Sequence, residues 1–581
     1  MRHSVWVLRG VLAAATTLAL AGCYKGNFGN CAVSCASSSD CPGDLACSAQ
    51  GLCSVGGASC EGMIPMPDAD LSQPQPLTVT KTGIGAVASL PAGIDCGDTC
   101  MTTFPPLSSV TLTATPDTTS VFEGWTGDCA SSPNADCALT MDGPKSAGAK
   151  FAAHGSVRWL KQISFTGQDY LDSKIDIDGN GNVVAAGQID DNGTNAMYVV
   201  KYNKVDGQIM WEKRLASPEA PFSFQSPAMA VDSAGNVYMC ARFQGFGSTT
   251  FNGMTVSADL YGNILAMRLA AADGTIEWLK QWGGDGQDVC DAAVVSGTDV
   301  FFTGSTSSSP STFGSVVLTG AGVDSGFIVK VPTATGNPTA GQVLVGTFQI
   351  FTIAENSGQI AIGGGFRSNF TGIAGCNMNI TGTGEDGFIM AFNNNLSCAF
   401  AKSYGSSTAN LTTTTYGVAG VPGGGWIATG GFQGAVLFAS SGSSIPNMGG
   451  TDAFIARYSG TGTHVYSFGY GTAGHEIGRR VEVLPTGEVV MAGEFGSQIT
   501  FGSTTLTGTN DIFVTRLSSG NTPLHQWQVK LGGQATEFVN DMVVDPQGTV
   551  NILADWTGMT DVGGTPLTAQ DYDAFVVSLV R

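Results

Sequence analysis

The segment Phe513-Val-Thr-Arg-Leu517 decides the fold, because close variants of it return along the chain at nearly even distances. Each copy is rich in aromatic and β-branched side chains, the composition of a buried strand. Seven copies are present: Tyr198-Val-Val-Lys-Tyr202, Leu265-Ala-Met-Arg-Leu269, Phe327-Ile-Val-Lys-Val331, Phe388-Ile-Met-Ala-Phe392, Phe454-Ile-Ala-Arg-Tyr458, Phe513-Val-Thr-Arg-Leu517 and Phe575-Val-Val-Ser-Leu579.

Two further segments accompany the copies. A turn precedes each one, such as Asp178-Gly-Asn-Gly-Asn182, in which glycine and asparagine supply the positive φ between two strands. An aromatic segment recurs at Trp159, Trp211, Trp278, Tyr466 and Trp527. About four short strands per unit, repeated between four and eight times, predict a β-propeller. We expect residues 155–581 to form an all-β, seven-bladed propeller. A solenoid is the alternative, although solenoids more often have shorter periods.

The stretch Ala230-Val-Asp-Ser-Ala-Gly-Asn-Val-Tyr238 resembles the β-propeller repeats of secreted bacterial proteins (SBBP-like repeats). The resemblance implies a propeller fold and no particular activity, since propellers serve both as binding modules and as enzymes. The unit at 340–398 departs from the pattern, because it has no Trp and adds Cys376 and Cys398. We expect those two cysteines to pair, and Cys240 to pair with Cys290 in the adjacent blade.

Val157–Ile163 lies before any inner strand, whereas the last unit lacks one strand. We therefore expect Val157–Ile163 to complete the final blade beside Ala574–Val580, which removes two open sheet edges.

A residue type that returns at the same place in every unit is explained by the geometry of the blade. A functional site is therefore expected where one unit differs from the repeat pattern. Asp169, Asp288, Glu476 and Glu537 recur, and we expect them to accept hydrogen bonds from neighbouring loops. The most polar departure is Gly474-His475-Glu476-Ile-Gly-Arg479-Arg480, where Arg479 replaces the Asp172, Asp291 or Asn540 of other units. His475, Arg479 and Arg480 are the candidate ligand-binding residues, for a carboxylate or sulfate group. A solvated loop paired with acidic neighbours is the alternative.

No catalytic residue, metal site or cofactor is predicted. Hydrolase, zinc and phosphate-loop motifs are absent from the sequence, and its five histidines are scattered. The segment Asp176–Asn182 resembles the start of a calcium loop, but Gly187 stands where the bidentate Glu would be, which favours a turn. Asp206–Trp211 and Asp273–Trp278 resemble the tryptophan-docking turns of quinone-dependent dehydrogenases. That resemblance gives the alternative function, a propeller oxidoreductase.

Residues 1–22 have the layout of an export signal, and Leu20-Ala21-Gly22-Cys23 resembles the lipobox of bacterial lipoproteins. The resemblance implies lipid attachment at Cys23, and Tyr24 after it favours the outer membrane. Residues 23–75 are expected to form a stalk and a Pro-rich linker. The stalk holds six closely spaced cysteines, for which disulfides are expected, with zinc as the alternative. Those cysteines are Cys31, Cys35, Cys41, Cys47, Cys53 and Cys60.

Residues 76–153 contain alternating strand patterns followed by Phe122-Glu-Gly-Trp-Thr-Gly127. This segment resembles the divergent B-repeat of internalin-related surface proteins, which implies a small β module that acts as a spacer or an adhesive unit. Within it we expect the local disulfides Cys96–Cys100 and Cys129–Cys137.

The net charge of −21 argues against nucleic acid as a partner, because an acidic chain repels phosphate backbones. We expect a non-enzymatic binding or scaffold lipoprotein at the outer membrane or cell surface, with an envelope or extracellular protein or glycan as partner. Recognition is expected in the loops that follow the second strand of each blade. These loops are residues 243–262, 304–325, 366–386, 432–451, 495–510 and 556–572.

Overall fold

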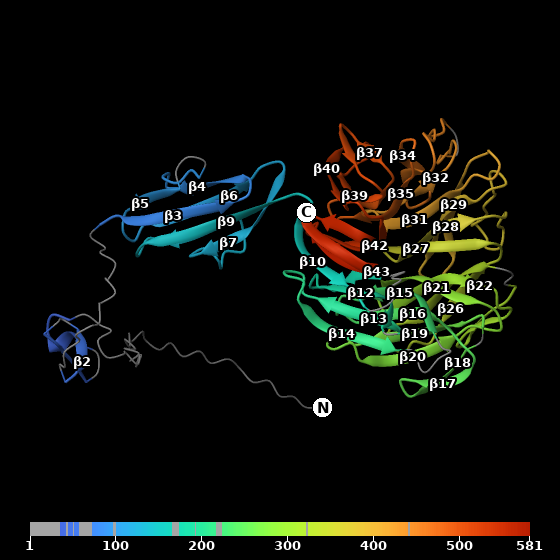
Figure 1. Cartoon of the computed structure of the whole chain (residues 1–581), viewed down its shortest axis with the longest axis horizontal. Coiled ribbons are helices and arrows are strands. Elements are labelled where there is room, and N and C mark those ends of the chain that lie inside the picture. Colours follow the sequence, from blue (N-terminus) through green and yellow to red (C-terminus); the bar gives the residue numbers. More distant parts are fainter. Residues whose placement is uncertain are drawn as a thin grey trace, which may run out of the picture. The chain divides into compact units, whose positions relative to one another are not determined.

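The computed structural model describes residues 35–41, 44–49, 52–56, 73–96, 100–165, 174–191, 193–216, 223–258, 260–320, 324–439 and 442–581. The predicted signal peptide and the lipid-attachment site at Cys23 lie outside these residues. The described chain consists of strands and one 3-10 turn, Ser38–Asp40 (Figure 1). Within it, no helix has the length and hydropathy of a membrane-spanning segment.

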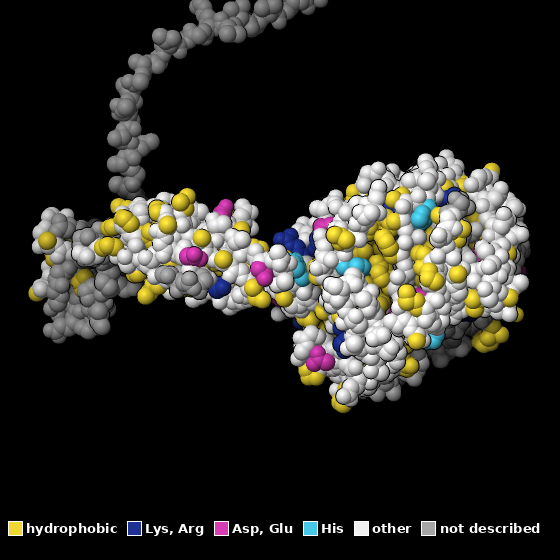
Figure 2. Space-filling view, turned by 90° about the horizontal axis from the view of Figure 1, so that it is seen from above, with side chains coloured by type: hydrophobic (Ala, Val, Ile, Leu, Met, Phe, Trp, Pro, Cys, Tyr) yellow, Lys and Arg dark blue, Asp and Glu magenta, His cyan; other side chains and the backbone are white. Residues whose placement is uncertain are grey.

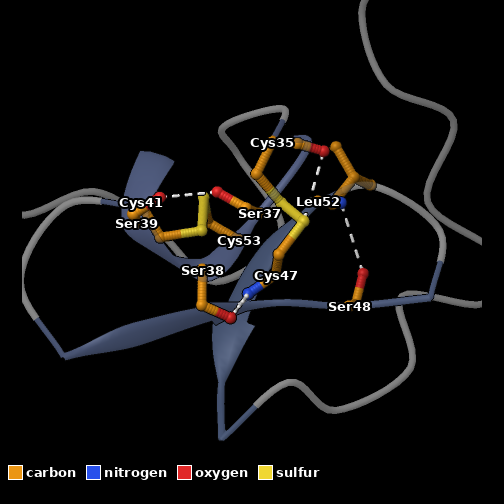
Figure 3. Close-up of a disulfide and its surroundings, with 9 residues drawn as sticks. All are labelled: Cys35, Ser37, Ser38, Ser39, Cys41, Cys47, Ser48, Leu52 and Cys53. Carbon is orange, nitrogen blue, oxygen red and sulfur yellow. Dashed lines mark hydrogen bonds between the residues drawn. A yellow bond between two sulfur atoms is a disulfide. The ribbon is translucent and has the colours of Figure 1, made fainter.

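The stalk contains a short hairpin of β1 (Leu45–Cys47) and β2 (Cys53–Val55). Two disulfides hold it, Cys35–Cys47 and Cys41–Cys53 (Figure 3). The disulfide expectation is therefore met for four of the six stalk cysteines, and Cys31 and Cys60 lie outside the described residues. The sulfur atoms of Cys35, Cys41 and Cys53 lie close enough to share a metal, but each belongs to a disulfide and is not a thiolate ligand.

Residues 75–153 form two small antiparallel sheets. The first has the order β5-β3-β9-β7 and the second the order β4-β6-β8. Alternation in β6 points Val110, Leu112 and Ala114 into the core, where Trp125 is also buried. The expected disulfides Cys96–Cys100 and Cys129–Cys137 are present. The strands are β3 (Gln75–Thr82), β4 (Gly85–Leu90), β5 (Met101–Phe104), β6 (Ser109–Pro116), β7 (Ser120–Gly127), β8 (Asp136–Thr140) and β9 (Lys145–Ala153).

The described residues between 157 and 579 build seven four-stranded antiparallel sheets. Six of them use strands in chain order. The first three sheets are β11 (Lys174–Ile177), β12 (Val183–Asp191), β13 (Thr194–Tyr202) and β14 (Ile209–Ala216); β15 (Ser223–Val231), β16 (Val237–Gln244), β19 (Asn263–Leu269) and β20 (Ile276–Trp282); and β21 (Asp288–Ser296), β22 (Asp299–Thr306), β25 (Ser325–Pro332) and β26 (Ala340–Leu344). The next three are β27 (Phe348–Asn356), β28 (Gln359–Phe366), β29 (Asp386–Asn393) and β30 (Cys398–Tyr404); β31 (Thr413–Gly420), β32 (Trp426–Phe432), β33 (Asp452–Tyr458) and β34 (His464–Tyr470); and β35 (Glu476–Val483), β36 (Val489–Phe495), β39 (Asp511–Leu517) and β40 (His525–Leu531). The repeated segment is the third strand of each sheet, so the predicted all-β, propeller-like architecture is confirmed.

The seventh sheet joins the two ends of this region. It has the order β10-β43-β42-β41, with β10 at Val157–Ile163, β41 at Glu537–Val544, β42 at Val550–Val562 and β43 at Thr565–Leu579. Lys161 pairs with Val576 in an antiparallel ladder, and β10 lies beside β43 in Figure 1. The predicted pairing of Val157–Ile163 beside Ala574–Val580 is confirmed.

Neighbouring sheets are joined by aromatic side chains that pack on glycines. The ring of Trp211 covers Gly274, and its indole N–H donates to the carbonyl of Ala271 at 3.0 Å. Trp159 and Trp278 cover Gly207 and Gly336 in the same way. The turns at Asp206–Trp211 and Asp273–Trp278 therefore contribute to packing between sheets. Each contains a glycine that is covered by the tryptophan ring of the neighbouring sheet, and a Cβ at that position would collide with the ring.

Two disulfides add covalent links within this region. Cys240 of β16 and Cys290 of β21 are both fully buried and bridge adjacent sheets. Cys376, in the loop between β28 and β29, pairs with Cys398 of β30. Both pairs are those expected from the sequence.

Several loops that follow the second strand of a sheet fold as hairpins. These hairpins are β17–β18 (Gly247–Phe251, Met254–Ala258), β23–β24 (Ser311–Phe313, Val316–Leu318) and β37–β38 (Gln498–Phe501, Thr504–Thr507). Each packs a phenylalanine inward: Phe501 contacts the rings of Tyr470 and Phe513. Charged side chains are sparse over the surface seen in Figure 2, in keeping with a charged content of 12%.

Candidate ligand-binding site

One edge strand of each sheet contributes to a common channel, and we call it the inner strand. The inner strands are β11, β15, β21, β27, β31, β35 and β41, and in the described residues six of them carry a β-bulge near their first residues. In each case the register shifts against the second strand, so one or two residues are left over and their side chains are re-aimed. The residues at the shifts include Pro227, Asp291, Phe351, Tyr416, Arg479 and Asn540. The predicted equivalence of Arg479 with Asp291 and Asn540 is thereby confirmed, and the fourth member of the prediction, Asp172, lies outside the described residues.

All six of these residues line one hollow of about 430 Å³. Its wall is completed by Lys174, Arg480, Glu494, Phe538, Val539, Asp555 and Tyr572. The hollow shares Lys174, Phe351 and Arg480 with the channel to which all seven inner strands contribute, so it is the mouth of that channel. We call this hollow the channel mouth.

Arg479 is held rigidly in the channel mouth. Its Nε and terminal nitrogen donate to the two carboxylate oxygens of Glu494 at 3.1 and 3.0 Å, a bidentate pair. The guanidinium carbon also lies 4.8 Å from the ring centre of Tyr416, which in turn packs on Phe351 at 5.1 Å. The Val539 N–H donates to the same carboxylate. Side chains from three sheets and a backbone N–H group of a fourth are therefore fixed relative to one another.

Arg480 turns toward the channel and forms an ion pair with Asp541, with Nε 2.6 Å from the carboxylate oxygen. Since Arg479 and Arg480 are both matched by carboxylates, the geometry does not favour a sulfate or carboxylate ligand. His475 is exposed and is not among the residues lining the channel mouth. The structure thus brings together two of the three candidate residues and leaves His475 apart. His475 lies four residues before Arg479, in the loop that precedes β35 and its bulge.

Deeper in the channel lie Asp176, Glu482 and Asp541, from three different sheets. Burial, together with the carboxylates of Asp541 and Asp176, raises the pKa of Glu482 to about 8. Burial also raises the pKa of Asp176 to about 7, although Asp176 accepts hydrogen bonds from the N–H groups of Val231 and Ile177. These groups bind protons near neutral pH, a property that sequence spacing does not reveal.

The recurring acids before the inner strands are structural, as expected. Asp288 accepts hydrogen bonds from Gly284 N–H and from the hydroxyls of Thr306, Ser308 and Ser311. The equivalent acids Glu476 and Glu537 accept from Thr472 and Thr560. Asp169 lies outside the described residues.

The calcium-like segment is a turn closed by its own side chains. The two Asp178 carboxylate oxygens accept from Asn180 N–H, Asn182 N–H and the Asn182 side chain. The remaining partner is Lys201, whose ammonium lies 2.9 Å away in a buried ion pair. A bound cation would have to displace that ammonium, so the residues present do not fit calcium.

Comparison with known protein families places one part of the chain. Residues 76–155 match the family model of the divergent InlB B-repeat domain. The predicted resemblance is confirmed for this module, whose signature Trp125 is buried in β7. The match concerns the B-repeat module only, and no curated protein matches the chain.

Solved structures similar to the chain include two whose titles name a propeller or a WD40 domain and one of a dehydrogenase. The Neurospora crassa Pan2 WD40 domain is 9% identical, with 74% of this chain and 96% of that chain covered and a TM-score of 0.40. The Dos1 propeller is 8% identical, with 73% and 95% covered and a TM-score of 0.36. A quinohemoprotein alcohol dehydrogenase from Pseudomonas putida HK5 is 9% identical, with 73% and 76% covered and a TM-score of 0.35. Such scores carry no argument here, and the propeller-like fold rests on the strand pairing of this chain.

Sequence reasoning missed the aromatic part of the channel mouth. Phe351 and Tyr416 occupy the bulge position of their strands, equivalent to Arg479 in the repeat. Aligning the repeat units residue by residue at that position would have found both.

Proposed function

We propose that this protein is an exported, lipid-anchored binding protein of the outer membrane or cell surface. Its seven sheets are the blades of one closed propeller, and the channel mouth is the recognition site. One observation carries the proposal: six strands each place a bulged residue around the same hollow. A bulge interrupts the ladder and re-aims a side chain, which is typical of sites on sheets.

The channel mouth has the features of a preformed binding site. It is concave, it combines aromatic rings with polar groups from several blades, and ion pairs fix its side chains. The loop 432–451 lies on the same face, because Gly450 N–H donates to the carbonyl of Gly474, just before the bulged strand. The loops expected to recognise a partner would therefore surround the channel mouth and extend it.

The recognition part of the proposal is tested by capture from envelope and growth medium. The bait is the full chain, beside a variant with Asn540→Trp, which fills the channel mouth. A partner retained by the wild-type chain and lost from the variant supports the proposal. A partner retained equally by both would place recognition elsewhere on the chain, and failure to capture any partner would count against a binding role.

The anchor is tested separately by Cys23→Ala. Because the lipobox resemblance implies a lipid on this thiol, we expect the variant to move from membrane pellets to the soluble fraction. Membrane association of the variant at the wild-type level would refute the anchor and leave the recognition site unaffected.

A further inference from the structure

We propose that the channel mouth binds an uncharged polyhydroxylated ligand, the chemistry of a neutral saccharide. This inference rests on the proposed function and specifies its ligand class. It is carried by the balance of charge, the exposed aromatic rings and the rigid polar groups of the channel mouth.

The charges of the channel mouth cancel. Its basic residues are Lys174, Arg479 and Arg480, and the acidic residues of the same lining are Asp291, Glu494 and Asp555. Arg479 is paired in bidentate fashion with Glu494, and Arg480 with Asp541 immediately below. An anionic ligand would have to compete with these carboxylates within a chain of net charge −21. An uncharged ligand meets no such penalty.

Two aromatic rings are partly open to solvent at the channel mouth. Phe538 and Tyr572 remain 39% and 37% exposed, on β41 and β43 of the last blade, with β42 between them. Phe538 pairs directly with Asp555 in the ladder between β41 and β42. An apolar ring beside a carboxylate suits a sugar, whose C–H face packs on the ring while its hydroxyls donate to the oxygens.

The remaining polar groups offer both donors and acceptors. Asp291 and Asn540 occupy bulge positions, and the Arg479–Glu494 pair presents a planar, fixed set of N–H and carboxylate groups. Hydroxyl groups both donate and accept, so they match a mixed site better than a purely anionic or cationic ligand does. Because the pair is already formed, little side-chain entropy is lost on binding. A hollow of about 430 Å³ falls in the range of sites for small ligands.

The test is titration calorimetry of the full chain with defined probes. The uncharged probes are di- and trisaccharides of glucose, galactose and N-acetylglucosamine, and the charged probes are a sulfated disaccharide and choline. The variants Phe538→Ala and Tyr572→Ala each remove one exposed ring. Matched controls are Phe468→Ala and Leu524→Ala, which remove exposed apolar side chains that lie outside both the channel mouth and the recognition loops.

We expect at least one uncharged saccharide to bind the wild-type chain, and each channel-mouth variant to weaken it by about tenfold or more, as for a central aromatic contact. The controls should bind as the wild type does. Binding of only a charged probe, saccharide binding equal in all variants, or no saccharide binding would overturn the inference. If capture of an envelope partner is still abolished by Asn540→Trp in those cases, the proposed function stands and the ligand class is wrong.

Discussion

At the scale of single residues, the channel mouth depends on the pair Arg479–Glu494. Their side chains are only 25% and 12% exposed, so removing one partner leaves the other charge poorly solvated. We expect Arg479→Met to lower the free energy of unfolding by roughly 2 kcal/mol or more, since breaking a buried pair is strongly destabilising. Urea denaturation monitored by circular dichroism measures the change.

The matching control is the double variant Arg479→Met with Glu494→Met. Replacing both partners with apolar side chains of similar length removes the unpaired charge, so we expect most of the lost stability to return. Equal destabilisation of the single and double variants would show that the charge pair is not the cause.

Glu482 makes stability depend on pH. Its pKa is about 8 in the folded chain against 4.5 as the ordinary value, because it is buried beside Asp541 and Asp176, with Arg480 opposing the shift. The folded state therefore holds a proton that the unfolded state releases between about pH 4.5 and 8. We expect the free energy of unfolding to fall as the pH rises through this window, and Glu482→Gln to reduce that slope.

Thermal unfolding of both chains at a series of pH values measures this dependence. Glu277→Gln, at a side chain that is 42% exposed, is the control and should keep the wild-type profile. An unchanged slope in the Glu482 variant would contradict the assignment.

At the scale of elements, the docking of tryptophans on glycines joins neighbouring sheets. A Cβ on Gly274 would lie 2.8 Å from the Trp211 ring, whereas one on Gly253 would meet nothing within 4 Å, and both glycines have positive φ, 68° and 76°. The backbone strain of alanine is thus similar at the two sites. We expect Gly274→Ala to cost roughly 1–3 kcal/mol more than Gly253→Ala, the size of an overpacking penalty. Equal losses of unfolding free energy in the two variants would show that the Trp211 ring moves aside without cost.

At the scale of the whole molecule, β10 joins the amino-terminal end of the propeller region to its carboxyl-terminal strand. Replacing Val157–Ile163 by a Gly-Ser segment of equal length leaves β43 as an open edge. We expect amide exchange to rise first in β42 and β43, although they are far from the substitution in sequence. The same replacement of the outer strand β14 is the control and should affect β13 first. Faster exchange near residue 174 before β43 would refute the role of this closure.

The sequence by itself determined the repeat, the turn before each third strand and the closure by β10. The spacing of the repeats and the glycine and asparagine residues of the turns can be read directly from the sequence. The strand missing from the last unit follows from counting the segments of each unit. The disulfides Cys129–Cys137 and Cys376–Cys398 were equally accessible, because their partners lie within a single small module or repeat unit.

Only the tertiary structure decided the site. A bulge is a register relation between two strands, so the sequence of one strand does not show that Phe351, Tyr416 and Arg479 are aimed at the same hollow. The same holds for the channel, where Arg480 meets Asp541 of the next sheet and Glu482 lies near Asp176. Such pairs arise because the inner strands of all seven sheets line one channel, so charged side chains that are far apart in the sequence lie close together.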